Sequence, residues 1–148
     1  MKVLVGSDHA ALSLKKFVVD RLRARGVEVE DMGAHDTASV DYPDYAVAVA
    51  RGVASGAGTF GILCCGTGQG MAMTANKIPG IRAAVCSDTF TAHATREHND
   101  ANVLCLGERV LGPGLAGDIV DLFLATAFEG GRHARRVEKI NALDGNQA

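Results

Sequence analysis

The sequence predicts an α/β protein in which helices cover both faces of a parallel β-sheet, and three observations support this prediction. Short apolar segments typical of buried strands alternate with amphipathic segments typical of helices along all 148 residues. The connections between these segments lack the short turns of β-hairpins, so the strands are expected to run parallel. The chain has the length of one ordinary domain and shows no linker or repeat, which predicts a single domain over residues 1–148.

Five apolar runs bounded by glycine or polar residues are predicted to be strands. In chain order they are residues 2–6, 27–31, 59–65, 81–86 and 101–107. Helices are predicted where apolar residues recur three and four positions apart. They are residues 11–26, 43–53, 71–77, 89–98, 114–128 and 132–143. Gly26 is expected to end the first helix, and Pro43 to begin the second.

The composition excludes several classes of protein. With a net charge of −2 and 47% hydrophobic residues, the chain is not basic enough for general nucleic-acid binding. No apolar run approaches the roughly 20 residues of a membrane span, and polar residues interrupt the apolar start of the chain too early for a signal peptide. The four cysteines, at positions 64, 65, 86 and 105, form no C-x-x-C pair. This favours reduced thiols in the cytoplasm over disulfides or a zinc site.

Candidate site residues are expected where the strands end. In open parallel sheets, ligands bind beyond the carboxyl ends of the strands, near the point where the strand order reverses. The residues that follow the predicted strands at this edge are 7–9, 65–70, 87–88 and 108–109. Asp8 and His9 follow the strand expected to adjoin the third one, and they could bind an anion or move protons. Asp8 could equally cap the next helix.

Two adjacent cysteines end the third predicted strand. Consecutive strand residues point to opposite faces, so Cys64 and Cys65 are expected in different environments, with Cys64 in the core. Cys65 precedes a loop that leads into a helix, and the free N–H groups there would favour its thiolate as a base or nucleophile. A second core cysteine is about equally consistent with the sequence.

The loop at residues 66–70, GTGQG, offers backbone amides to a negatively charged oxygen such as a phosphate or an enediolate. It lacks the G-x-x-x-x-G-K-[ST] phosphate-loop pattern. Met71 also stands where the dinucleotide pattern G-x-G-x-x-G requires its last glycine. A tight turn could need the same glycines, and Asp88 lies at a distance suited to a ribose-binding acid, so a nucleotide site stays open as an alternative.

Two arginines near the start of the last predicted helix indicate a bound anion. Arg132 and Arg136 are four residues apart and share one face, where their positive charge opposes the helix dipole. Guanidinium groups that bind an anion would relieve this conflict, with a solvated basic face as the alternative.

The turn His98-Asn99-Asp100 before the fifth strand is either a capped helix end or part of the site. His93 and His98 are five apart and lie on different sides of their helix. No combination of histidines and carboxylates has the spacing of a metal site, which predicts chemistry without a metal.

Six blocks of the sequence together resemble, from end to end, the B type of ribose-5-phosphate isomerase in the ribose/galactose phosphate isomerase family. They are GSDHA, DYPDYA, CGTGQG, ANK with GIRAAVC, REHNDANVL and EGGRHARRVEKI. The resemblance implies one Rossmann-like three-layer α/β/α domain with a five-stranded parallel sheet. It also implies a cytoplasmic, cofactor-free enzyme of the pentose phosphate pathway. Its active site would be shared across a homodimer or dimer of dimers, with the helix near 132–143 contributing to both.

The implied reaction interconverts ribose 5-phosphate and ribulose 5-phosphate through a cis-enediolate. Cys65 is implied as the base that moves the carbon-bound proton, because Met71 replaces the glutamate base of another branch of the family. Thr67 would hold the enediolate, His98 would open the sugar ring, and Asp8 would assist hydroxyl proton transfer. The implied substrate-binding residues are His9, Tyr42, Gly66, Gly68, Gly70, Asn99, Arg109, Arg132 and Arg136.

Two other functions stay open on the sequence. A six-carbon substrate, allose 6-phosphate or galactose 6-phosphate, shares the reacting end of the sugar and differs in length. A non-catalytic nucleotide- or phosphate-binding module of the same fold would not need Cys65. A cysteine-dependent phosphatase is disfavoured, because its C-x5-R signature would need arginine where Met71 stands.

Overall fold

Five parallel strands form the centre of the structure, a computed structural model that describes residues 1–145. The strands are β1 (Lys2–Ser7), β2 (Glu28–Asp31), β3 (Phe60–Cys65), β4 (Ala83–Val85) and β5 (Val103–Gly107). Their order across the sheet is β2-β1-β3-β5-β4, and every pairing is parallel. The predicted five-stranded parallel sheet is therefore confirmed.

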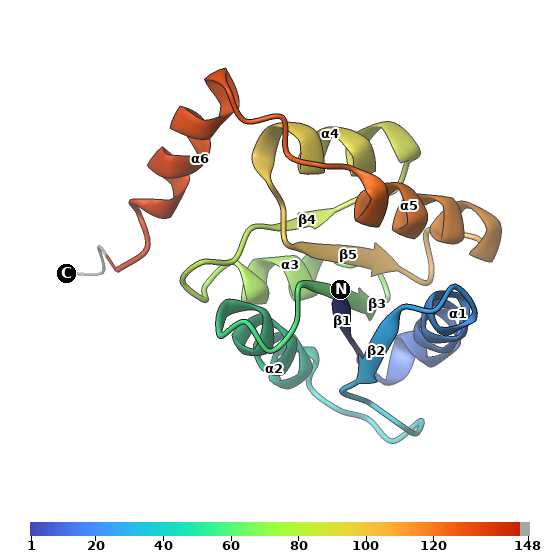
Figure 1. Ribbon diagram of the computed structural model, residues 1–148. Helices are drawn as coiled ribbons and strands as arrows, with labels where there is room; N and C mark the ends of the chain where they lie inside the picture. Colours follow the sequence, from blue (N-terminus) through green and yellow to red (C-terminus); the bar gives the residue numbers. More distant parts are fainter. Residues whose placement is uncertain (146–148) are drawn as a thin grey trace.

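Helices cover both faces of this sheet (Figure 1). They are α1 (Leu12–Ala24), α2 (Tyr42–Ala54), α3 (Gln69–Ala75), α4 (Thr89–Asn99), α5 (Pro113–Ala125) and α6 (Arg132–Asn141), with a 3-10 turn, η1 (His9–Ala11), before α1. One apolar core lies between the sheet and α1, α4 and α5, and a second lies between the sheet and α2 and α3. This is the Rossmann-like three-layer arrangement that the sequence predicts.

Several elements are shorter than predicted, for local reasons. The predicted strand 81–86 reduces to β4 at the sheet edge, where the Asn76 side chain bonds both backbone groups of Ala83. The predicted helix 114–128 ends at Ala125, because Thr126 has an extended backbone and its hydroxyl donates to the Leu122 carbonyl. The last helix ends at Asn141 rather than near residue 143. None of the helices within residues 1–145 has the length and hydropathy needed to cross a membrane.

The strand order reverses at the centre of the sheet. From β1 the chain moves outward to β2, whereas from β3 it moves in the opposite direction to β4 and returns to β5. The carboxyl ends of β1 and β3 therefore flank the switch point, where such sheets bind ligands. Ser7 is paired with Cys64, which confirms the prediction that the strand before Asp8 adjoins the strand that ends in Cys65.

Helix α6 leans away from the body of the molecule (Figure 1). Near its start it contacts α4, where the His133 ring stacks on the His98 ring with centroids 4.3 Å apart. Further along, Ile140 is exposed, as is Leu143 just beyond the helix. The helix and the residues after it thus carry apolar side chains that their own chain does not bury.

Candidate active site

Backbone hydrogen bonds continue beyond the ends of the central strands. The Asp8 amide donates to the Cys64 carbonyl over 3.2 Å, and the Glu108 amide donates to the Cys65 carbonyl over 2.9 Å. Asp8, Cys65 and Glu108 therefore lie at one level along the carboxyl edge of the sheet. The sequence prediction that residues following separate strands meet at this edge is confirmed for this group.

The two adjacent cysteines have the opposite orientations expected of a strand. Cys64 packs in the α1/α5 core, where burial raises the pKa of its thiol far above the ordinary value. Cys65 packs on the α2/α3 side and is 5% exposed, yet its sulfur accepts a hydrogen bond of 3.0 Å from the Gly68 amide. Cys65 therefore combines the two interpretations that the sequence leaves open, a core position and a thiol facing loop amides.

The loop after Cys65 is held against the end of β5. Gly68 has a φ of +81°, and a Cβ on it would lie 3.2 Å from the Leu106 backbone, so the turn requires glycine. Gly66 differs, because the nearest atoms to a Cβ there would be those of the Arg109 side chain, at an ordinary 3.6 Å. The fold does not require glycine at position 66, where the loop is half-exposed beside the Arg109 side chain. The helix that follows, α3, has only seven residues, so the loop amides matter more here than a helix dipole.

Gly70 is bare for a reason that the sequence does not reveal. A Cβ at Gly70 would lie 2.5 Å from the Tyr42 ring, which covers this residue from the start of α2. Packing against Tyr42 is thus sufficient to require glycine at position 70, whether or not its amide binds a substrate. Thr67 is exposed, and its hydroxyl accepts a weak hydrogen bond of 3.3 Å from the Gln69 amide.

Asp8 and His9 are both held in place by backbone groups. The Asp8 carboxylate accepts a hydrogen bond of 3.0 Å from the Ala10 amide, so the alternative that Asp8 caps a helix is correct. His9 Nδ1 accepts a hydrogen bond of 3.1 Å from the Val40 amide. A neutral His9 ring therefore carries its proton on Nε2, which is the nitrogen left to donate to an anion.

The remaining predicted residues lie at the opposite ends of the strands, the amino-terminal ends. His98 and Asn99 end α4 and precede β5, whose first residue, Val103, is paired with Gly61. This pair stands four residues before the level of Cys65, about 13 Å along the strand. Arg132 and Arg136 begin α6, which contacts the same end of α4. One chain therefore does not bring these four residues to Cys65.

The turn at His98 and Asn99 is fixed by two arginines that the sequence analysis did not identify. Asp100, which ends α4, has a φ of 47°, and its carboxylate is bonded by Arg96 at 2.7 Å and by Arg82 at 3.2 Å. Arg82 also donates to the Asn99 and Asp100 carbonyls. The turn is thus a capped helix end, which was one of the two alternatives left open by the sequence. It presents His98 and Asn99 in a defined orientation.

A carboxylate and a second histidine beside His98 were also not identified from the sequence. Glu129 Oε2 lies 3.3 Å from His133 Nε2 and 4.0 Å from His98 Nε2. Glu129 and His133 are four residues apart, a spacing visible in the sequence, but only the packing of α6 on α4 brings them to His98. Sequence spacing alone could not reveal this group, because its members come from two helices and the segment between them.

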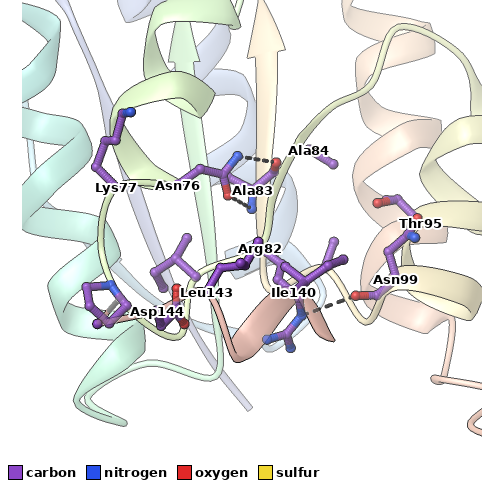
Figure 2. Close-up of a pocket in the computed structure, with 14 residues that line it drawn as sticks. Asn76, Lys77, Arg82, Ala83, Ala84, Thr95, Asn99, Ile140, Leu143 and Asp144 are labelled. Atoms are coloured by element: carbon purple, nitrogen blue, oxygen red, sulfur yellow. Dashed lines mark hydrogen bonds between the residues drawn. The ribbon is translucent and has the colours of Figure 1, made fainter. Parts of the chain in front are cut away.

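A groove of about 790 Å³ lies elsewhere on the molecule and is not lined by Cys65. It lies between α6 and the edge strand β4 and is partly lined by Arg82, Asn99, Ile140 and Leu143 (Figure 2). Arg82 is occupied there by backbone carbonyls. Apart from Asn99, none of the candidate site residues lines this groove, so the switch point remains the better candidate for the reaction site.

The nucleotide alternative loses its main support. The Asp88 carboxylate accepts a hydrogen bond of 2.7 Å from the Thr91 amide and caps the N-terminus of α4. Asp88 is therefore engaged as a helix cap rather than presented as a ribose-binding acid.

Comparison with known proteins shows the family of this chain. Residues 3–140 match the family described as Ribose/Galactose Isomerase. The chain is 50% identical over 143 residues to ribose-5-phosphate isomerase B of Escherichia coli (strain K12), covering 97% of this chain and 96% of the relative. It is 44% identical over 141 residues to D-erythrulose-4-phosphate isomerase of Pectobacterium atrosepticum, covering 95% and 93%. The solved structure of Clostridium thermocellum ribose-5-phosphate isomerase B superposes with a TM-score of 0.98 at 53% identity over the full length of both chains. The resemblance found in the sequence is thereby confirmed, and the chain belongs to the ribose/galactose isomerase family.

Proposed function

We propose that this chain interconverts ribose 5-phosphate and ribulose 5-phosphate through a cis-enediolate, with Cys65 as the base. This proposal rests on the position of Cys65, the last residue of β3 at the switch point. Its sulfur accepts a hydrogen bond of 3.0 Å from the Gly68 amide. A relative 50% identical over nearly the whole chain is named ribose-5-phosphate isomerase B, which supports the same substrate here.

Cys65 moves the carbon-bound proton. Its thiolate removes the proton from C2 of the open-chain aldose, and the C2–H electron pair forms the enediolate double bond as the carbonyl oxygen becomes an oxyanion. Return of the same proton to C1 gives the ketose. Cys64 is unsuited to this role, because it faces the other core and burial raises the pKa of its thiol.

The loop and Asp8 complete this half of the site. Gly66 leaves the loop accessible, so its amides and the exposed Thr67 hydroxyl hold the enediolate oxygens. Asp8 lies level with Cys65, directly after the neighbouring strand, and transfers the hydroxyl proton between O1 and O2. His9 donates from Nε2 to the phosphate, with Arg109 and Tyr42 at the rim of the same loop.

A second copy of the chain supplies the other half of the site. His98, which opens the ring, and Asn99, which binds the sugar, lie at the far edge of the sheet from Cys65. The phosphate-binding pair, Arg132 and Arg136, begins α6 near this edge. In a homodimer, or a dimer of dimers, these groups of one copy meet Cys65 of the other.

The apolar side chains on and near α6 support this assembly. Ile140 and Leu143 are exposed beside a groove that the chain itself leaves open, and a partner subunit would cover them. The unit of function is then a single isomerase domain, residues 1–148, whose last helix serves both the dimer and the partner's site. Residues 146–148 lie outside the described part of the chain.

Relatives of this chain are named for sugar phosphates of different chain length. One relative, 44% identical, is named D-erythrulose-4-phosphate isomerase, so sugar phosphates of different length occur within the family. We place the reaction of this chain in the pentose phosphate pathway and in the cytoplasm, where its four free thiols would stay reduced.

The test is ribulose 5-phosphate formation from ribose 5-phosphate in excess EDTA, with wild type and Cys65→Ala compared. Activity that resists the chelator and disappears in Cys65→Ala supports both the reaction and the base. Equal activity in the two proteins removes Cys65 from its role. A folded but inactive wild type contradicts the assigned substrate and directs the assay to four- and six-carbon phosphates.

A further inference from the structure

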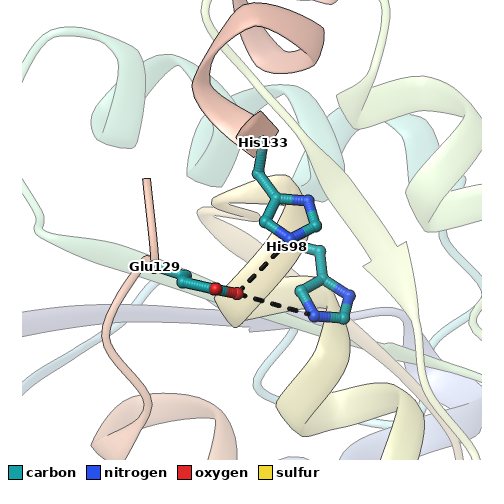
Figure 3. A group of neighbouring side chains, drawn as sticks. All are labelled: His98, Glu129 and His133. Carbon is teal, nitrogen blue, oxygen red and sulfur yellow. Dashed lines mark ion pairs between the residues drawn. The ribbon is translucent and has the colours of Figure 1, made fainter. Parts of the chain in front are cut away.

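Three side chains that meet between α4 and α6 offer the donor atoms of a transition-metal site. His98 comes from the end of α4, His133 from α6, and Glu129 from the segment before α6 (Figure 3). One donor atom from each lies within 4.8 Å of the other two. Two imidazoles and one carboxylate form a ligand set that zinc uses in proteins, with a fourth position left for water.

The distances are close to those of a metal site. Donor atoms bound tetrahedrally at zinc distances lie about 3.3 Å from one another. His133 Nε2 and Glu129 Oε2 are already 3.3 Å apart, and His98 Nε2 is 4.0 Å from the same oxygen. The remaining adjustment is a rotation of the His98 and Glu129 side chains, which are about half exposed. The rotation of His98 takes its ring out of the stack with His133, so that both imidazole lone pairs can point at one ion.

The hydrogen bonds within this cluster make conflicting demands on His133 Nε2. His133 Nε2 faces the Glu129 carboxylate, which requires a proton on that nitrogen. The same nitrogen accepts a 3.5 Å contact from Arg132 Nε, which requires a lone pair there. A divalent cation satisfies the carboxylate and the imidazole lone pair together, while the exposed Arg132 side chain turns to solvent.

A second carboxylate adds negative charge beside the cluster. Glu97 Oε2 lies 3.4 Å from His98 Nε2 and 3.0 Å from His93 Nε2. Its charge is therefore shared between two imidazoles, only one of which belongs to the cluster. With Glu129 it provides two carboxylates around the position that a cation would take, which favours a divalent ion.

We propose that His98, Glu129 and His133 form a binding site for Zn²⁺ or a similar transition-metal ion, and that occupation of this site inhibits the enzyme. Inhibition rests on the proposed function, because a metal bound to His98 Nε2 withdraws this imidazole from ring opening. Metal binding itself does not depend on that function. The site is regulatory in effect, since it competes for a side chain that the reaction needs.

Binding is tested with the full chain after EDTA treatment and desalting. Co²⁺ is titrated while its visible absorption is recorded, because bound tetrahedral Co²⁺ absorbs far more strongly than the aqueous ion, and Zn²⁺ is then added as the competitor. We expect one saturable site per chain, from which Zn²⁺ displaces Co²⁺. Absence of a saturable Co²⁺ spectrum in the wild type, with no Zn²⁺ binding by calorimetry, overturns the proposal.

Matched variants locate the site. Glu129→Gln and His133→Gln are each expected to weaken Zn²⁺ binding at least about tenfold. His93→Gln is the control, since it removes an imidazole from a neighbouring His–Glu pair four residues apart and leaves the three ligands intact. Wild-type affinity in both Glu129→Gln and His133→Gln, verified as folded by circular dichroism, contradicts the assignment, and so does equal loss in His93→Gln.

The inhibitory consequence has a separate readout. Zn²⁺ is expected to abolish ribose 5-phosphate isomerisation at the concentration that displaces Co²⁺, EDTA to restore it, and Glu129→Gln to resist it. Unchanged activity at saturating Zn²⁺ refutes inhibition through His98. If the wild type isomerises no sugar phosphate, the proposed function fails, while the Co²⁺ spectrum still decides whether the metal site exists.

Discussion

The amide of Gly68 donates a hydrogen bond to the sulfur of Cys65 across 3.0 Å. Gly68 can do so because its φ of +81° folds the loop back over the end of β3, against the backbone of Leu106. An N–H aimed at sulfur stabilises a thiolate more than a thiol. This contact therefore links the backbone conformation of the loop to the proposed chemistry of the cysteine.

Removal of the Cys65 thiol should abolish catalysis and leave the fold intact. We expect kcat/KM to fall by about 10²- to 10⁴-fold in Cys65→Ala, the usual contribution of a positioned base. Cys65→Ser is the matched variant, because it keeps the size and the hydrogen-bond acceptor of the side chain. The serine hydroxyl is a much weaker acid than a thiol and is therefore rarely ionised. Steady-state kinetics with urea unfolding would check this, and near wild-type turnover in Cys65→Ser would argue against a thiolate base.

Two glycines of the same loop should separate stability from activity. Gly68→Ala forces a left-handed conformation on alanine beside the Leu106 backbone, and should cost about 1–2 kcal/mol of unfolding free energy. Gly66→Ala has room for its methyl group and should change stability by less than about 0.5 kcal/mol. We nevertheless expect Gly66→Ala to lose activity, because the methyl group would stand beside Arg109 on the half-exposed part of the loop where the substrate is proposed to bind. Full activity in Gly66→Ala would show that the substrate does not approach there.

The arginines of α6 should matter for binding more than for turnover. Arg136→Ala should raise KM for ribose 5-phosphate about tenfold or more, the expected loss of a charged hydrogen bond to phosphate, with a smaller change in kcat. Arg135→Ala provides the control, because it removes the same charge from a different face of the helix. Equal rises in KM for Arg135→Ala and Arg136→Ala would mean that only the net positive charge of the helix matters.

The Asp31–Lys15 ion pair should produce a pH dependence of stability on the acid side. Burial alone would raise the pKa of Asp31, but the hydrogen bonds from Lys15 and the Gly33 amide outweigh it and lower the pKa below its ordinary value. A lowered carboxyl pKa stabilises the fold above the unfolded-state value, about 4, and this stabilisation is lost as the pH falls through the lower folded-state value.

Urea unfolding of wild type and Asp31→Asn from neutral pH to about pH 3 would measure this effect. The difference in unfolding free energy should be constant near neutral pH and should narrow below about pH 4. Asp20→Asn is the control, because it breaks an exposed ion pair with Lys16 that contributes little. A difference between wild type and Asp31→Asn that stays constant to the lowest pH would contradict the assigned cause.

The sheet was predictable because its signals are local. Alternating strands and helices and the opposite orientations of Cys64 and Cys65 all follow from periodicity within a few residues. The carboxyl-edge group of Asp8, Cys65 and Glu108 was predictable for a related reason, since parallel strands place their ends together once their order is known.

Contacts between distant segments could not be predicted in this way. Nothing near Gly70 in the sequence indicates that the Tyr42 ring would lie 2.5 Å from a Cβ at this position, so the packing reason for this glycine was not visible. Glu129 and His133 have a visible spacing, but their third partner, His98, comes from another helix. Helix ends also depended on single side chains, as at Thr126.

The most direct test of a shared active site is the activity of a hybrid dimer. Cys65→Ala and His98→Asn chains, each inactive alone, would carry different affinity tags, be co-expressed and be purified through both tags. If Cys65 of one chain acts with His98 of the other, one of the two sites in the hybrid is intact, and the hybrid should show about half the wild-type activity. A hybrid dimer with no more activity than its inactive parents would place both residues in the same chain's site and contradict the shared architecture.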